Sequence, residues 1–464
     1  MQQGSATRPL ALQQHEPGET APLGIVAGDP GAGEVGQWPR PAYAWYVVAI
    51  LLLAMTLAFV DRYVLSLLVE PIKADLGVSD TQIGLLQGVP FGIFYAIFGV
   101  PLGRLADQRN RRNLLAGCVL LWSLFTAACG MAKGYALLFV ARIGVAIGEA
   151  GLPPTTMSLI SDYFPKDKRT KPFGLFMCGV HIGGGLALLV GGVVLQWIQS
   201  SGGLVLPLLG SVAAWRVAFV LVGLPGLLLV LLFLTVREPL RHDSAPPFRI
   251  AEVGGYLRSH GRLYAAIFCG MATIGMVGTA IIAWVPAMLM RVRGLDHQQV
   301  GYGFGMAVLV GGVSGALLAG WWEDWFAQRG HKDAKLRVAI ACALGMIPFG
   351  LVGCLSSNSV LVMASIGVLM MLYAMPLVLG PAAIMCITPG RLRGQVGAVY
   401  VMTIGLVGGL LGPTLVPVLT DYVFRNEAAL NYSLACLIIA CCPLAALVFT
   451  LGRAAYRARV DQVD

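Results

Sequence analysis

The sequence predicts an all-α membrane protein with twelve transmembrane helices, arranged as two pseudo-symmetric six-helix bundles. Three observations support this fold class. The 464-residue chain is 57% hydrophobic and only 12% charged, whereas ordinary soluble domains contain about 25% charged residues. Its apolar residues gather into stretches long enough to cross a bilayer. Two loop motifs also recur at matching places in the two halves of the chain.

Each predicted span is an apolar stretch of about 20 residues or more, the length that an α-helix needs to cross the hydrocarbon core of a membrane. The loops between the spans are short and carry most of the charged residues. The stretches lie at residues 43–68, 81–103, 112–132, 135–159, 172–198, 213–236, 263–290, 298–322, 335–355, 359–385, 394–422 and 430–452.

Basic residues are distributed unevenly between the two sets of loops. Most of the 32 Lys and Arg residues fall on the face that carries both chain ends. Because positively charged loops stay in the cytoplasm, we expect both termini to be cytoplasmic. Short loops without sorting signals favour the inner (plasma) membrane of a cell. The opposite face has only Lys73, Lys133, Arg216, Arg291, Arg293 and Arg425.

A basic loop that contains prolines divides the spans six and six. We therefore expect an N-terminal bundle over residues 42–236, a cytoplasmic linker over 237–262 and a C-terminal bundle over 263–455. Residues 1–41 are rich in Pro, Gly and Gln without a sustained apolar core, so they predict a disordered cytoplasmic tail. A second, short cytoplasmic tail is expected over residues 456–464.

Loop motifs indicate that the two bundles are related. Residues 103–107, after the second span, have a counterpart in residues 320–324 after the eighth. Residues 165–169, after the fourth span, correspond in the same way to residues 389–393 after the tenth. A parallel duplication of this kind places a substrate site between the bundles, near the middle of the membrane.

Several motifs resemble those of a known family. Gly103 and Asp107, followed by Arg109, Arg111 and Arg112, look like the loop signature between the second and third helices of the major facilitator superfamily. Motifs similar to those of its Spinster-like branch are Asp61-Arg62, Gly148-Glu149-Ala150, Ser161-Asp162-Tyr163-Phe164-Pro165, Arg393-Gly394-Gln395 with Ala398 and Tyr400, and Gly412-Pro413-Thr414.

This resemblance extends from Tyr43 to about Ala455. It implies the major facilitator fold and transport by alternating access. For characterised relatives it also implies export of lysophospholipids or sphingoid phosphates, in some cases driven by protons. Organic-anion symporters share a similar stretch from Arg142 to Pro153, so a small organic anion remains an alternative substrate.

Four charged residues fall inside predicted spans: Asp61, Arg62, Arg142 and Glu149. A charge at that depth costs at least about 2.5 kcal/mol on insertion scales, so such residues usually face a cavity. The helical rise places Asp61 and Arg142 at similar heights, and Glu149 two turns beyond Arg142 on the same helix face. Asp61 and Arg62 point about 100° apart and do not pair with each other.

We expect Asp61 and Glu149 to couple transport to protons, and Arg62 and Arg142 to bind an anionic head group. A guanidinium binds a carboxylate or phosphate in a bidentate manner and pairs with an acid when that acid is ionised. Protonation then biases the equilibrium between inward-open and outward-open states. The alternative is that these residues form fixed ion pairs that only set helix packing.

Polar and charged residues elsewhere complete the expected site. The second half has no central charge, so Trp284, Tyr373, Tyr400 and Thr403 are expected to form a largely apolar and aromatic substrate-binding wall. His181, in the fifth span, is either a hydrogen-bonded structural residue or a proton relay. Loop charges are expected to pair across spans and latch a cytoplasmic gate; they are Asp107, Arg111, Arg112, Asp162, Arg169 and Asp324.

Other classes of protein fit the sequence less well. His181 is the only histidine within a span and no Gly-x-Ser-x-Gly motif occurs, which argues against an intramembrane enzyme. We expect no metal and no cofactor. The expected partners are a small-molecule or lipid substrate, protons and the bilayer, with no nucleic acid, and the protein is expected to be a monomer. Drug efflux and a non-transporting receptor or scaffold remain alternatives.

Overall fold

A computed structural model describes residues 38–165, 168–200, 204–206, 210–241, 250–389 and 392–463. In these residues, twelve helical segments are long and apolar enough to cross a membrane, which confirms the predicted fold class. The predicted tail over residues 1–41 lies outside the described part of the chain except for its last four residues. The first helix, α1, already begins at Pro41.

The N-terminal half contains six of the spans. They are formed by α1 (Pro41–Leu67); by α3 (Asp80–Val89), the π-helix η1 (Pro90–Phe94) and α4 (Tyr95–Gln108); by α5 (Arg111–Gly130); by α6 (Tyr135–Ala150) with α7 (Leu152–Tyr163); by α8 (Thr170–Ser200); and by α9 (Ala214–Leu234). A short helix, α2 (Val69–Leu76), follows α1, and the strands β1 (Leu204–Leu206) and β2 (Gly210–Val212) form an antiparallel hairpin before α9.

The C-terminal half contains the other six. They are formed by α11 (Gly261–Arg293); by α12 (His297–Met306), η3 (Ala307–Gly311) and α13 (Gly312–Ala327); by α14 (Ala334–Leu355); by α15 (Ser359–Ile387); by α16 (Arg393–Ile404), η5 (Gly405–Gly409), α17 (Leu410–Val418) and η6 (Leu419–Phe424); and by η7 (Glu427–Ala429) with α18 (Leu430–Val463). The linker includes α10 (Ile250–Ser259), and α18 continues through the segment predicted as a C-terminal tail.

Helix starts support the predicted duplication. Span two begins with a capping box in which the Ser79 side chain accepts from the amide of Gln82, and the Gln82 side chain accepts from the amide of Ser79. Span eight begins with the same arrangement of Asp296 and Gln299. Each box satisfies amides that a helix start leaves without partners. The same local signal therefore starts the equivalent helix in each half.

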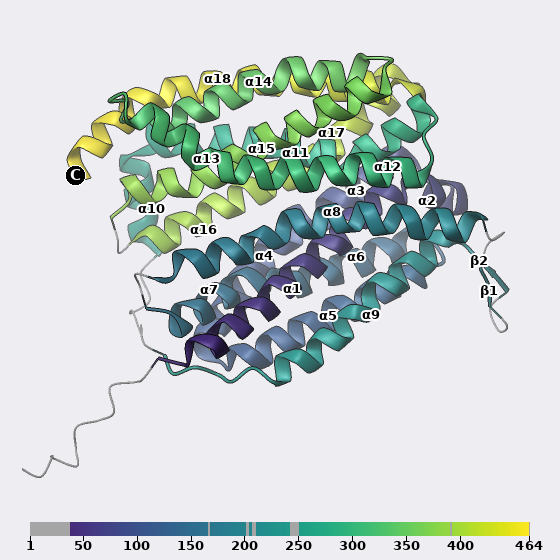
Figure 1. Cartoon of the computed structure of the whole chain (residues 1–464), viewed down its shortest axis with the longest axis horizontal. Helices are drawn as coiled ribbons and strands as arrows, with labels where there is room; N and C mark the ends of the chain where they lie inside the picture. Colours follow the sequence, from purple (N-terminus) through teal and green to yellow (C-terminus); the bar gives the residue numbers. More distant parts are fainter. Residues whose placement is uncertain are drawn as a thin grey trace, which may run out of the picture. The chain divides into compact units, whose positions relative to one another are not determined.

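The two halves lie side by side with their helices roughly parallel (Figure 1). We call the end at which α1 begins and α18 ends the terminus end, and the end that carries β1 and β2 the hairpin end. Contacts between the halves are made chiefly by α3 with α17 and by α8 with α12. At the terminus end, α7 and α10 have their main contacts within their own halves.

Glycines allow these two inter-half contacts to be close. A Cβ added at Gly88 of α3 would lie 2.6 Å from the carbonyl oxygen of Leu410 in α17. A Cβ added at Gly192 of α8 would lie 2.5 Å from the carbonyl oxygen of His297 in α12. Small residues let helix backbones approach in a membrane, where packing is a main source of helix association. Both contacts hold the halves together towards the hairpin end.

Candidate functional site

The four intramembrane charges form two ion pairs between α1 and α6. Arg142 lies 2.9 Å from Asp61, and Arg62 lies 2.6 Å from Glu149. The predicted heights of Asp61 and Arg142 are therefore confirmed. The neighbouring residues Asp61 and Arg62 of α1 pair with residues at different levels of α6, because Arg142 and Glu149 are two turns apart in that helix.

Local backbone features position these side chains. Span four is interrupted at Gly151, immediately after α6, and α7 starts with prolines at 153 and 154. Glu149 therefore lies in the last turn of α6, close to a break in the span. Across from it, η1 places Phe91 against the guanidinium groups of both Arg62 and Arg142, at 4.5 and 4.8 Å from its ring centre. π-helical turns of this kind occur frequently at functional sites.

The Asp61–Arg142 pair is enclosed, and both oxygens of its acid have partners, whereas Nε of Arg142 has none among the described residues. The side chains are 3% and 1% exposed. One Asp61 oxygen accepts from Arg142, and the other accepts from the hydroxyl of Thr126 in α5. Removing one member of such a pair leaves an isolated buried charge, which costs far more than the pair itself gains. This geometry is suited to holding α1, α5 and α6 together.

The Arg62–Glu149 pair is more open and less satisfied. The Arg62 side chain is 20% exposed, whereas Glu149 is 1% exposed. Oε1 of Glu149 is buried and has no hydrogen-bond partner among the described residues. Rings of Phe59, Phe91 and Tyr95 surround the Arg62 guanidinium at 4.5 to 5.0 Å. Arg62 is thus the cation that a solute can reach, and Glu149 has a free oxygen that can take a proton.

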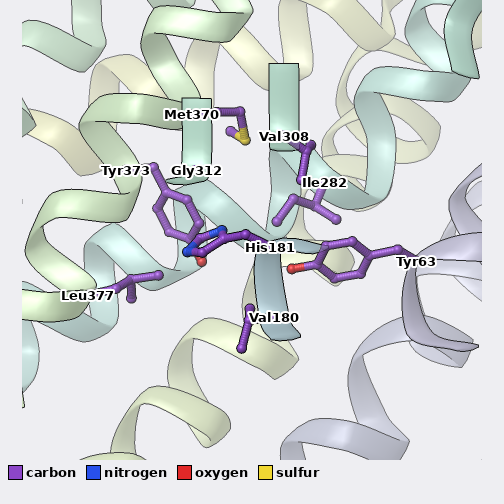
Figure 2. A pocket seen from close by; sticks show the side chains of 9 residues that line it. All are labelled: Tyr63, Val180, His181, Ile282, Val308, Gly312, Met370, Tyr373 and Leu377. Carbon is purple, nitrogen blue, oxygen red and sulfur yellow. The ribbon is translucent and has the colours of Figure 1, made fainter. Parts of the chain in front are cut away.

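A cavity lies between the halves beside this pair. Its free volume is about 20 Å³, which is room for little more than one water molecule in this conformation. Figure 2 shows the hydroxyl groups of Tyr63 and Tyr373 directed towards the ring of His181. The cavity is lined by Tyr63, Val180, His181, Ile282, Val308, Gly312, Met370, Tyr373 and Leu377. Neither Arg62 nor Glu149 lines the cavity. Phe59 connects the two places, because its ring lies 5.0 Å from the Arg62 guanidinium and 5.6 Å from the ring of Tyr63.

Of the predicted substrate-binding wall, the structure places only Tyr373 in this cavity. Trp284 is fully buried, and its indole N–H donates to the carbonyl of Pro413, 2.7 Å away, so it joins α11 to α17. Tyr400 is 3% exposed, with its hydroxyl near the backbone of Gly380. The Thr403 hydroxyl donates to the carbonyl of Val399 in its own helix. In this conformation these three residues do not line the cavity.

Where both partners are described residues, the predicted gate residues make their hydrogen bonds and ion pairs within single halves. Arg111 pairs with Asp162 and lies 2.7 Å from Glu238, so it connects α5, α7 and the segment after α9. The Arg112 amide donates to Glu238, the Asp107 carbonyl accepts from Arg241, and Arg169 donates to the carbonyls of Ser161 and Phe164. The Asp324 side chain is exposed. Each ion pair between described residues at the terminus end lies within one half.

The hairpin end contains a charge network that joins the halves and that sequence reasoning missed. Arg291, at the end of α11, lies 2.5 Å from both Glu70 and Asp80 of the N-terminal half. Lys73 bridges in the same way from Asp80, at 2.6 Å, to Glu427 in the C-terminal half, at 2.9 Å. A signal for this network was present in the sequence. Only six basic residues were assigned to this face, and two of them, Lys73 and Arg291, form the network.

A hydroxyl contact adds to this network. Asp421, in η6, accepts from both the amide and the hydroxyl of Thr81, at 2.8 and 2.7 Å. The hairpin end is therefore closed by ion pairs, a capped helix start and glycine contacts, whereas the terminus end has no ion pair between the halves among the described residues. This conformation is sealed at one end and has its cavity between the halves.

Comparison with known proteins identifies the family. Residues 51–413 match the sequence profile of the Major Facilitator Superfamily. A protein described as an MFS-type efflux pump, from Mycolicibacterium smegmatis, is 30% identical over 425 residues, covering 90% of this chain and 94% of the relative. A probable L-galactonate transporter of Escherichia coli is 27% identical over 305 residues, 62% of this chain and 63% of that protein.

A solved structure agrees with these relatives. The crystal structure of a bacterial homologue of the human lysosomal transporter Spinster, in an inward-facing and unoccupied conformation, superposes with a TM-score of 0.73 at 25% identity, covering 92% of this chain and 98% of that one. The chain therefore belongs to the Major Facilitator Superfamily, a family of membrane transporters and not of enzymes, and within it resembles the Spinster proteins.

Proposed function

We propose that this transporter moves an anionic amphipathic molecule, such as a lysophospholipid or a sphingoid phosphate, and couples its movement to protons. The observation that carries the proposal is the Arg62–Glu149 pair, in which the cation is partly exposed and the acid keeps an unpartnered oxygen. Apolar residues dominate the adjacent cavity, which suits a substrate that joins an anionic group to an apolar body.

Charge balance explains how the coupling works. The two acids and two arginines of the site give it no net charge when all are ionised. An anion that takes Arg62 from an ionised Glu149 leaves a buried carboxylate without its cation, and that is costly. A proton on Glu149 removes this cost and frees the guanidinium for bidentate binding of the anion. Proton binding and anion binding therefore strengthen each other, and the effect is reciprocal.

Alternating access then requires two gates. The network around Arg291 and Asp80 supports a closed gate at the hairpin end. By the positive-inside rule the terminus end is cytoplasmic, so the conformation is inward-facing and both termini lie in the cytoplasm of an inner or plasma membrane. We propose that the halves rock together at the terminus end in the outward-facing state, and that the loop charges Asp107, Arg111, Arg112, Asp162, Arg169 and Asp324 then form the second gate.

Symport of a small organic anion with protons is a second candidate. The similarity to a probable L-galactonate transporter favours it, since a carboxylate would use Arg62 in the same way. Both candidates share the anion site and differ in what the apolar cavity wall binds. We further propose that the protein works as a monomer, because each half contributes to a single cavity within one chain.

Transport in proteoliposomes tests the proposal. Wild-type protein is expected to move a lysophospholipid or sphingoid phosphate faster when a pH gradient is imposed, and Glu149→Gln is expected to lose the gradient dependence. Asp75→Asn is the matched control, because its exposed pair with Arg216 lies away from the cavity. Gradient-driven uptake of a small carboxylate without lipid flux would replace the lipid proposal by the symporter. No anion flux of either kind would refute the proposed function.

A further inference from the structure

The cavity contains polar groups that the ion pairs do not account for. His181 comes from α8, Tyr63 from α1 and Tyr373 from α15, so both halves contribute. Among the described residues, none of these three side chains forms a hydrogen bond, although Figure 2 shows both hydroxyl groups directed towards the imidazole. The rest of the lining is apolar apart from the backbone at Gly312. Polar groups in such surroundings normally have a partner.

Glycines hold the three rings in place. A Cβ at Gly312 would lie 2.3 Å from Nδ1 of His181, so the imidazole lies directly on the backbone of α13. A Cβ at Gly184 would lie 2.4 Å from the ring of Tyr63, and one at Gly278 would lie 1.9 Å from the ring of Tyr373. Each ring therefore occupies space that exists only because the residue facing it is glycine. Such pre-positioned groups bind a ligand with little loss of side-chain freedom.

The chemistry of the three groups defines what they can bind. A neutral imidazole has one donor and one acceptor, and each phenol can donate or accept. No Lys, Arg, Asp or Glu lines the cavity, so the groups suit a neutral oxygen better than a second charged group. A hydroxyl, which both donates and accepts, fits this set. This hydroxyl belongs close to the anionic group of the substrate, because Phe59 packs against both the Arg62 guanidinium and the Tyr63 ring, at 5.0 and 5.6 Å.

We propose that His181, Tyr63 and Tyr373 form a hydroxyl-binding subsite next to the anion site, so that the transporter selects anions that carry a hydroxyl beside the charged group. This inference rests on the proposed function. It adds that selectivity comes from hydrogen bonds made by both halves, so the substrate itself bridges α1 and α8 to α15. A ligand that lacks the hydroxyl leaves these polar groups without a partner, which penalises binding.

Two probes that differ in a single hydroxyl test the subsite. One is a 1-acyl-glycerol 3-phosphate, and the other is its 2-deoxy analogue, a 1-acyl-propanediol 3-phosphate. In proteoliposomes we expect the wild type to prefer the hydroxylated probe about tenfold in flux at subsaturating concentration, the size of effect that one or two neutral hydrogen bonds produce. Tyr373→Phe and His181→Ala are expected to bring this ratio close to one.

A matched variant and a stability measurement separate binding from folding. Tyr302→Phe removes a hydroxyl from α12 at a position that is 51% exposed, and it is expected to keep the wild-type ratio. Tyr373→Phe removes only an oxygen atom, so it remains informative if the melting temperature of His181→Ala shows that this variant does not fold.

The possible results distinguish a failure of the hydroxyl subsite from a failure of the proposed function. Wild-type flux that is equal for both probes, or a preference that survives in Tyr373→Phe, overturns the hydroxyl subsite and leaves the proposed function intact. Absence of wild-type flux for both probes, with and without a pH gradient, refutes the lipid function and the subsite together. A preference that is lost in both cavity variants and kept in Tyr302→Phe supports the inference.

Discussion

The two ion pairs between α1 and α6 have the same chemistry and different surroundings. Asp61 and Arg142 are both enclosed, and Thr126 satisfies the second carboxylate oxygen. In the other pair Arg62 is 20% exposed and one Glu149 oxygen has no partner among the described residues. A buried acid whose two oxygens both have partners makes an ion pair structural, whereas partial exposure of the cation with an unpartnered carboxylate oxygen allows exchange. We therefore assign packing to the first pair and transport to the second.

The largest expected effect is a difference in protein stability between variants of the two ion pairs. Arg142→Met leaves Asp61 buried without its cation, so we expect a loss of about 3–5 kcal/mol in the free energy of unfolding. Arg62→Met is expected to cost less, because Glu149 can bind a proton in place of its partner. Thermal unfolding in detergent measures both. Equal losses for the two variants would remove the distinction between the pairs.

For proton-coupled transport, we expect the Arg62–Glu149 pair to matter more than the Asp61–Arg142 pair, the reverse of their order in stability. Glu149→Gln mimics the protonated acid and frees Arg62, so we expect gradient-driven flux to fall at least about tenfold while exchange of labelled for unlabelled anion persists. Counterflow and gradient-driven uptake in the same proteoliposomes measure the two activities. Glu70→Gln is not a suitable control, since Glu70 pairs with Arg291 at the hairpin end; Asp75→Asn is the appropriate one. Loss of both activities would mean that Glu149 is structural.

The gate at the hairpin end gives a smaller, conformational effect. Arg291→Met removes the ion pairs to Glu70 and Asp80 that join the halves, and truncating one member of a buried charge pair typically costs about 2–5 kcal/mol. We expect the population to shift towards the outward-facing state. Distances between spin labels on the two halves at the hairpin end measure the shift. Arg216→Met is the matched control, because Arg216 pairs with Asp75 within one half, and an equal shift there would argue against the gate.

A glycine substitution gives the smallest expected effect. In Gly192→Ala the new Cβ would meet the carbonyl of His297 across the halves, so the close contact of α8 with α12 must loosen. We expect a two- to tenfold reduction in flux, corresponding to roughly 0.5–1.5 kcal/mol. Gly174→Ala in the same helix meets no atom within 4 Å. Equal fluxes for the two variants would show that this contact does not influence the transport cycle.

Much of the fold was predictable, because span length and hydropathy are local properties. The similar depth of Asp61 and Arg142 also followed from helical rise, since each residue is a fixed number of turns from the end of its span. The Arg291 network was not predictable, because Arg291, Asp80 and Glu427 are far apart in the sequence and meet only when the two halves pack. Trp284 illustrates the opposite error: an aromatic residue in a span looks like a cavity wall until its partner, the Pro413 carbonyl, is known.

Proton uptake on anion binding tests the central claim most directly. Binding of a lysophospholipid phosphate to purified protein would be followed by calorimetry in buffers of different ionisation enthalpy, with wild type compared with Glu149→Gln. If the anion takes Arg62 when Glu149 binds a proton, the wild type takes up about one proton per anion above the pH at which free Glu149 is protonated, and Glu149→Gln takes up none. Binding without proton uptake in the wild type, or the same uptake in both proteins, would contradict the account.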